Sequence, residues 1–167
     1  MYNDFITNLL HVCKSLNNFS VKYLIVGGSS VSLHGYVRMS KNEQNEISEK
    51  VDLDFWYEPT YENYFNLLKA LEELDINIDQ LKKEKSPNPR KSFLKFKTKY
   101  FKLDLLPEIK GLAKFNDSFK NRQEFSVQDI LISTLNYDDL IKSKYALHRP
   151  KDLIDIIELK KANRNKS

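Results

Sequence analysis

The chain has 167 residues, about the size of one ordinary domain, and 41% of them are hydrophobic, 30% charged and 12% aromatic, with only 4 Gly and 5 Pro. This composition belongs to a folded globular protein and excludes disordered, collagen-like and low-complexity classes. The formal net charge is +4, and no apolar run approaches the roughly 20 residues that cross a bilayer, so we expect no membrane association.

The chain begins with a predicted amphipathic helix. Its apolar residues recur at helical spacing: Phe5, Leu9, Val12, Cys13 and Leu16. The start is acidic, with Asp4 and no basic cluster, unlike a signal peptide, so we expect a cytoplasmic protein. The single cysteine excludes an internal disulfide, and its apolar neighbours predict a small core residue rather than a redox or zinc-binding group.

A buried strand is predicted at Tyr23 to Val26, and it runs into a tight turn at Gly27-Gly28. A short helix from Ser29 to Leu33 follows. The polar segment 41–50 predicts a loop, after which the chain returns as a second strand, Val51 to Trp56.

Pro59 and Thr60 predict the start of the next helix. Its apolar stripe consists of Tyr61, Tyr64, Phe65, Leu68, Leu71 and Leu74. After a turn at 86–89, the segments 93–97 and 100–106 predict a hairpin across Thr98-Lys99, with Lys102 and Asp104 on one face of its second strand.

The C-terminal third predicts more helix. Residues 128–135 form a strand or a short helix, Asn136 or Asp138 caps a helix through Tyr145, and Pro150 begins the last helix. The whole chain predicts an α+β fold, a small mixed sheet flanked by helices. We expect one domain over 1–167, with the sheet at about 20–110 and a C-terminal helical part at about 136–163.

Positive charge is concentrated in one segment. Residues 82–102 contain nine basic side chains against the single acid Glu84, a local charge of +8. Such a stripe suggests a polyanionic partner, either the phosphates of a small molecule or a nucleic-acid backbone. The alternative is a solvated hairpin face with no ligand.

Three aspartates form the strongest chemical signal. Alternation puts Asp52 and Asp54 on one face of their strand, and Asp104 lies on a later strand. Adjacent carboxylates repel one another unless a cation lies between them, and an all-oxygen ligand set suits Mg2+. If all three meet, they can hold a pair of metal ions, the arrangement used for phosphoryl or nucleotidyl displacement. The alternative for an isolated Asp-x-Asp is surface or capping chemistry.

The Gly27-Gly28-Ser29-Ser30 turn would complete such a site. Glycine permits close approach of a phosphate, and N–H groups with a serine hydroxyl favour its negative charge. By itself a Gly-Gly turn is more often only a turn.

Several segments resemble the polymerase-β-like nucleotidyltransferase superfamily. They are Tyr23 to Ser30, His34 to Arg38, Val51 to Trp56, and the C-terminal stretches Leu140 to Lys144 and Arg149 to Asp155. The chain looks most like a small bacterial branch that includes abortive-infection, toxin-type nucleotidyltransferases. The 23 residues between Gly28 and Asp52 are about twice the usual number, which marks 41–50 as an insertion.

The resemblance implies an NTP substrate and Mg2+ as cofactor, with two ions and Mn2+ as a substitute. It implies that Asp52, Asp54 and Asp104 bind the metal, that Asp104 also deprotonates the acceptor, and that Gly27, Gly28 and Ser29 hold the triphosphate. Because many relatives have Ser at the place of Gly28, the hydroxyl role passes to Ser29 or Ser30.

Other basic and aromatic residues have two interpretations each. Arg38, Lys91 and Lys144 either contact the nucleotide or form ordinary ion pairs and solvated positions. His34 is expected to support the turn before Gly35, and Trp56 is expected to pack rather than to stack on a base.

The function expected from the sequence is a Mg2+-dependent nucleotidyltransferase that moves a nucleoside monophosphate to an acceptor hydroxyl and releases pyrophosphate. The acceptor is RNA such as tRNA, a protein or a small molecule. The alternative is a non-catalytic nucleotide- or RNA-binding module, or a toxin–antitoxin component, that uses the 82–102 stripe. A homodimer or a partner subunit that completes the site is compatible with both.

Overall fold

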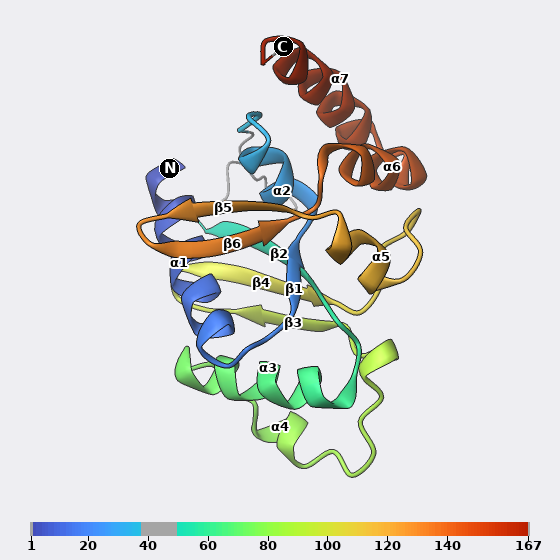
Figure 1. Cartoon of the computed structure of the whole chain (residues 1–167). Helices are drawn as coiled ribbons and strands as arrows, with labels where there is room; N and C mark the ends of the chain where they lie inside the picture. The colour runs from blue at the N-terminus through green and yellow to red at the C-terminus, as the bar shows by residue number, and fades with distance from the viewer. Residues whose placement is uncertain (1, 38–49, 167) are drawn as a thin grey trace.

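The computed structural model describes residues 2–37 and 50–166 (Figure 1). The predicted loop residues 41–49 and the candidate Arg38 lie outside the described residues. The elements, in chain order, are α1 (Tyr2–Asn18), β1 (Tyr23–Ile25), α2 (Gly27–Leu33), β2 (Val51–Tyr57), α3 (Tyr61–Glu73), α4 (Asp79–Lys82), the 3-10 helix η1 (Pro89–Lys91), β3 (Leu94–Lys97), β4 (Phe101–Leu106), α5 (Phe115–Lys120), β5 (Gln123–Val127), β6 (Ile130–Thr134), α6 (Tyr137–Leu147) and α7 (Pro150–Arg164).

The fold is α+β, as the sequence predicted, and it is built on one six-stranded mixed sheet. The strand order is β3-β4-β2-β1-β6-β5. β2 runs parallel to β4, and β1 parallel to β6, whereas the β1–β2, β3–β4 and β5–β6 pairs are antiparallel. The sheet therefore extends to Thr134, beyond the 20–110 span expected from the sequence.

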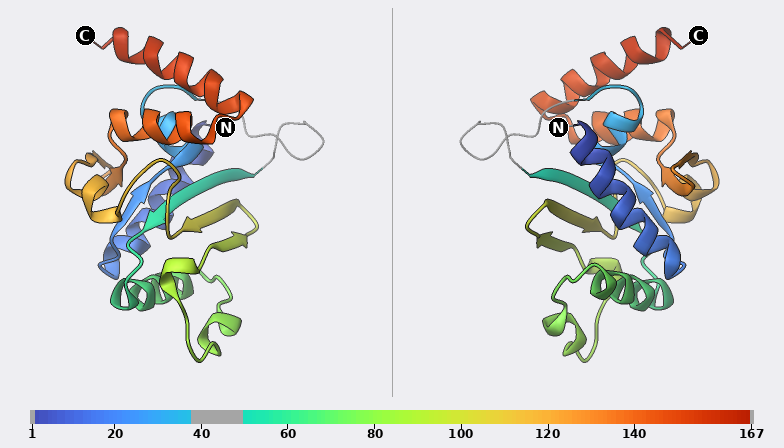
Figure 2. Two further views of the ribbon diagram at one scale, coloured as in Figure 1. Left: turned by 90° about the vertical axis from the view of Figure 1, so that its right-hand side faces the viewer. Right: turned by 90° about the vertical axis from the view of Figure 1, so that its left-hand side faces the viewer.

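Helices cover the two faces of the sheet unequally. On one face α1 and α3 pack against alternate strand residues such as Leu53, Phe55 and Leu103, which are fully buried. On the other face a second apolar cluster forms around Leu24 and Trp56 with residues of α2, α5, α6 and α7. Figure 2 shows α6 and α7 at the opposite end of the molecule from α3 and α4. None of the helices in the described ranges is both long and apolar enough to cross a membrane.

The predicted helices and hairpin are largely confirmed. Cys13 and its apolar neighbours in α1 are buried, and the hairpin of β3 and β4 has the predicted faces. Its turn lies at Lys99-Tyr100, one residue beyond the predicted Thr98-Lys99, because the N–H of Thr98 donates to the carbonyl of Phe101. The predicted stripe of α3 is wrong at two positions, because Tyr61 and Phe65 are 61% and 48% exposed. The reason is Asn63, whose buried amide exchanges hydrogen bonds with the backbone of Lys22 and fixes which side of α3 faces inward.

Strand β5 and helix α5 were not predicted. Four of the six residues of α5 are polar, and one of them, Ser118, is buried, so its sequence shows no clear apolar period. The β5–β6 hairpin turns at Gln128-Asp129, and both residues have left-handed backbone conformations. Such a turn usually contains Gly or Asn, so the pair Gln-Asp does not predict it from the sequence.

Candidate functional site

The candidate site lies on the sheet face opposite to α1 and α3. Asp52, Asp54 and Trp56 of β2 point to this face, since Leu53, Phe55 and Tyr57 are buried on the other. Trp56 is covered by Phe115 of α5 at a ring-centroid distance of 5.3 Å. The two aspartates are only half-buried, so the helical cover ends between Trp56 and Asp54 and leaves the carboxylates accessible.

The third aspartate joins them through the strand register. β2 and β4 are parallel neighbours, and Asp54 lies directly opposite Asp104. Neighbouring strands are roughly 4.8 Å apart, so two in-register side chains on one face lie side by side. The sequence prediction that a later strand brings a third carboxylate to the Asp-x-Asp strand is therefore met by the backbone geometry.

The pKa of the Asp104 carboxyl is raised above its ordinary value. Burial raises the pKa of the Asp104 carboxyl, Lys95 opposes that effect, and the negative charge of Asp52 raises it further. The charge of Asp52 therefore acts on Asp104 although the two residues lie on different strands and are not directly opposite each other. A cation between these groups would relieve the repulsion.

Gly27 lies against the carboxylate of Asp54. Its φ is +57°, and a Cβ atom built on it would come within 2.9 Å of Asp54 Oδ2. The position therefore excludes a side chain both by backbone conformation and by space. The first residue of α2 therefore contacts the carboxylate of Asp54 in β2. The N-cap residue of α2, Val26, makes no side-chain hydrogen bond to the first N–H groups of the helix.

Ser29 fixes α2 to β2 between the two aspartates. Its hydroxyl donates to the carbonyl of Asp52 and accepts from the N–H of Asp54, both at 3.1 Å. Ser29 is 1% exposed. The side chain thereby holds the Asp-x-Asp backbone beside the glycine turn.

Ser30 turns to the opposite side and is bound inside the protein. Its hydroxyl lies 2.7 Å from Thr134 Oγ1, which donates to the carbonyl of Ile25, so Ser30 is the donor in the first bond. The hydroxyls of both Ser29 and Ser30 are therefore engaged internally. The expected contact of one of these hydroxyls with a phosphate would require such a bond to break, whereas the backbone of the turn needs no such change.

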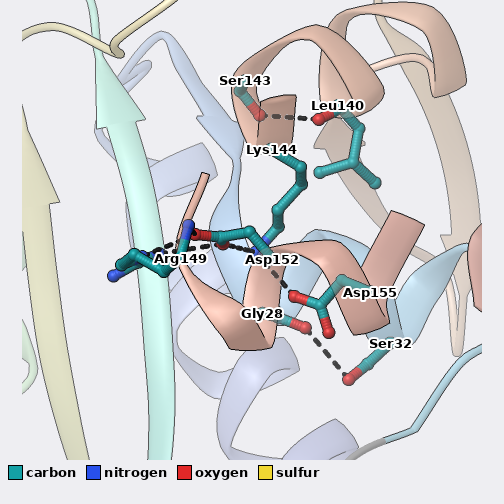
Figure 3. Close-up of polar contacts among 8 residues, drawn as sticks. All are labelled: Gly28, Ser32, Leu140, Ser143, Lys144, Arg149, Asp152 and Asp155. Atoms are coloured by element: carbon teal, nitrogen blue, oxygen red, sulfur yellow. Dashed lines mark hydrogen bonds and ion pairs between the residues drawn. The ribbon is translucent and has the colours of Figure 1, made fainter. Parts of the chain in front are cut away.

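Lys144 is also engaged inside the fold. Its ammonium lies 2.9 Å from Asp155 Oδ2 and 3.3 Å from Asp152 Oδ1, and all three side chains are at most 1% exposed (Figure 3). This buried trio joins α6 to α7. The ion-pair interpretation of Lys144 thus agrees with the structure, whereas the nucleotide contact would require the ammonium to leave two carboxylates.

Arg149 is the residue near the site that the sequence analysis left without a role. Its Nε and Nη2 donate to Asp152 at 2.6 and 3.0 Å, which orients the guanidinium (Figure 3). The hydrogen bonds that Arg149 donates to Asp152 are the main cause that raises the pKa of Arg149, and the charge of Asp54 adds to their effect. The side chain is 46% exposed. The signal in the sequence was the i,i+3 pair of Arg149 and Asp152 at a Pro-started helix, a common capping arrangement that does not by itself indicate a ligand.

The remaining candidates separate clearly. His34 is buried, and its Nε2 lies 2.8 Å from the carbonyl of Leu135, so it supports the fold as expected. Trp56 packs in the second apolar cluster and donates to the carbonyl of Pro107. Lys91 is exposed on η1, and the hydroxyl of Tyr57, at the end of β2, donates to the carbonyl of Pro89 in this helix. In the described ranges no contact links Lys91 to the aspartates.

The aspartates fit Mg2+ as a partly completed site. Across residues 2–37 and 50–166, no three His, Cys, Asp or Glu side chains are already gathered as a set that could hold a metal ion. Mg2+ is commonly held by one or two carboxylates, with waters and substrate phosphates as the other ligands. The in-register pair Asp54 and Asp104, with Asp52 on the same face of β2, meets that requirement.

Comparison with known proteins identifies the fold. Neither a family model nor a curated protein matches the sequence. Among solved structures, a lincomycin-bound lincosamide antibiotic adenylyltransferase, LnuA, matches with a TM-score of 0.55 at 15% identity, over 96% of each chain. An antigenic nucleotidyltransferase-like protein from Paracoccidioides brasiliensis matches with a TM-score of 0.52 at 13% identity, over 94% of this chain and 75% of that one. The chain therefore has a polymerase-β-like nucleotidyltransferase fold.

Proposed function

We propose that this protein is a Mg2+-dependent nucleotidyltransferase, which moves a nucleoside monophosphate from an NTP to an acceptor hydroxyl. One observation carries the proposal: Asp54 and Asp104 lie in register on parallel neighbouring strands, with Asp52 on the same face and a side-chain-free Gly27 against Asp54. A nucleotidyltransferase-like fold supports it.

Asp52, Asp54 and Asp104 are the residues that would hold the metal. Bound there, Mg2+ would stabilise negative charge on the attacking and leaving oxygens. Asp104 has a second role, as the group that takes the proton of the acceptor hydroxyl when its oxygen attacks the α-phosphorus and pyrophosphate leaves.

The glycine turn supplies backbone contacts to the triphosphate. Gly27 and Gly28 leave no Cβ between the chain and a phosphate, while Ser29 holds this turn against β2. Arg149 is oriented by Asp152 and is half exposed, and the charge of Asp54 reaches its guanidinium, so we assign it to the phosphates as well. Lys91 and Arg38 remain candidates for nucleotide contacts.

The finer family assignment is part of the same proposal. It includes the toxin-type branch, and a partner subunit or a second copy that completes the site, because a chain of 167 residues would enclose the site only partly. A lincosamide adenylyltransferase shares the fold, but the likeness extends to the fold alone and does not carry its substrate to this chain.

Calorimetric titration of a non-hydrolysable NTP analogue, with Mg2+ and with EDTA, tests the proposed site. We expect binding that needs Mg2+ and that Asp54→Asn and Asp104→Asn both abolish. Asp117→Asn, which removes an exposed carboxylate from α5, is the matched control and should bind like the wild type. Equal binding with EDTA, or by both site variants, would contradict the proposal.

A further inference from the structure

The lysines of the basic stripe lie on two sides of the molecule. Lys82 pairs with Glu72 at the α3–α4 end, away from the aspartates. Lys95 and Lys97 of β3 instead alternate with the inward-facing Leu94 and Phe96 and are exposed on the face that carries the aspartates. Only this second group is placed to act with the site.

The strand register arranges these side chains in two rows. One row runs Lys95, Asp104, Asp54 across β3, β4 and β2, and the other runs Lys97, Lys102, Asp52. At about 4.8 Å per strand, Lys95 lies one strand from Asp104 and roughly 10 Å from Asp54. On this face of the sheet the charge therefore changes from positive at the edge strand β3 to negative at β2, over three neighbouring strands.

The edge lysines lie outside the ion pairs of the described residues, although the charge of Lys95 acts on Asp104, its neighbour in the strand register. Within the described ranges, Lys95 and Lys97 make no ion pair with an acidic side chain. Lys95 lies 4.9 Å from the ring centroid of Phe93, which is 49% exposed and continues the alternation of the same face. Proteins that bind single-stranded nucleic acid combine exposed aromatic rings, on which bases stack, with exposed basic side chains that contact the phosphates.

We propose that the β3 edge, Phe93, Lys95 and Lys97, binds a single-stranded nucleic acid and presents its terminal hydroxyl to Asp104. Two lysines about 6.6 Å apart along one strand suit successive phosphates of a chain better than a single small anion. This inference rests on the proposed function, since it names the class of acceptor for that reaction. The transferred nucleotide would form a new phosphodiester bond with the terminal oxygen, pyrophosphate would leave, and Asp104 would take the hydroxyl proton.

Fluorescence anisotropy with labelled 12-nucleotide RNA and DNA strands, at several salt concentrations and in EDTA, tests the surface separately from catalysis. Each lost lysine–phosphate contact reduces the slope of log affinity against log salt by about 0.7, so Lys95→Gln/Lys97→Gln should reduce it by about 1.4 and weaken binding about 25-fold at 0.1 M salt. Lys14→Gln/Lys69→Gln, the same charge change on exposed positions of α1 and α3, should bind like the wild type. Comparison of the labelled RNA with the labelled DNA shows which of the two nucleic acids binds more tightly.

The outcomes distinguish this inference from the proposed function. No strand binding, or equal losses in the two double variants, would overturn the inference, even if Mg2+-dependent NTP binding is present. Strand binding that depends on Lys95 and Lys97 supports the surface. If such binding occurs but no NTP label reaches a strand with a free 3′ hydroxyl, transfer is contradicted while the surface stands. Label on that strand, and none on a 3′-phosphorylated one, supports both.

Discussion

Replacing Gly27 with alanine separates the geometry of the site from the stability of the fold. The new methyl group would meet Asp54 Oδ2 at 2.9 Å and its Cγ at 3.2 Å, on a backbone with φ of +57°. A non-glycine residue in this region costs about 1–3 kcal/mol of the free energy of unfolding. For a chain of this size each kcal/mol lowers Tm by roughly 2–4 °C. The carboxylate of Asp54 must also move, so we expect Mg2+-dependent NTP binding to be lost in molecules that are still folded.

Gly35→Ala is the matched control for this prediction. Gly35 has φ of +104°, so alanine is strained there too, but its Cβ would meet only Ala162 Cβ at 3.6 Å, an ordinary contact. Urea unfolding and calorimetry on both variants give the two quantities needed. We expect Gly35→Ala to lose stability and keep NTP binding. Gly27→Ala with wild-type affinity for Mg2+ and NTP would refute the reasoning that places the nucleotide beside Asp54.

Three further predictions concern the charges. Lys144→Met should lower the free energy of unfolding by about 3–5 kcal/mol, because it removes the buried ammonium that lies between the carboxylates of Asp152 and Asp155, whereas the exposed Lys142→Met should change it by less than about 0.5 kcal/mol in urea unfolding. Asp104→Asn should unfold at the same or a higher Tm than the wild type at pH 7, since the raised pKa shows that the charged form is disfavoured, while pyrophosphate release is lost; a large fall in Tm would show that Asp104 is structural. Burial alone would raise the pKa of Asp152, but hydrogen bonds from Arg149 and the charge of Lys144 outweigh it and lower the pKa to about 2. The stabilisation from Asp152, roughly 2 kcal/mol, is therefore present above about pH 4 and lost as the pH falls toward 2, and acid unfolding of Asp152→Asn should lack this component.

The sequence predicted most of the sheet that carries the site because its signals are local. Alternation of apolar and polar residues placed Asp104 opposite to Phe101, Leu103 and Leu105, and a short apolar run ending in two glycines marked β1. The order of the strands was not readable, since it depends on long-range pairing. The Asp54–Asp104 register, on which the proposal rests, became visible only when β2 and β4 were paired.

The roles of the polar side chains were harder to predict. Ser29, Ser30 and Lys144 are residue types that bind phosphates, yet all three are buried and bonded within the fold. A sequence shows the donor but not the internal acceptor that occupies it. Arg149 was passed over for the converse reason, because its position beside β2 arises from the packing of α7 and not from its neighbours in the chain.

Transfer of label from α- and γ-labelled NTPs tests the central claim most directly. The wild-type protein is incubated with Mg2+, each NTP in turn, and a cell extract that contains nucleic acids, proteins and small molecules, beside Asp54→Asn and Asp117→Asn. The account predicts that the α label moves to an acceptor and the γ label appears as pyrophosphate, with the wild type and Asp117→Asn alone active. Transfer of the γ label to the acceptor, or equal α-label transfer by Asp54→Asn, would contradict it.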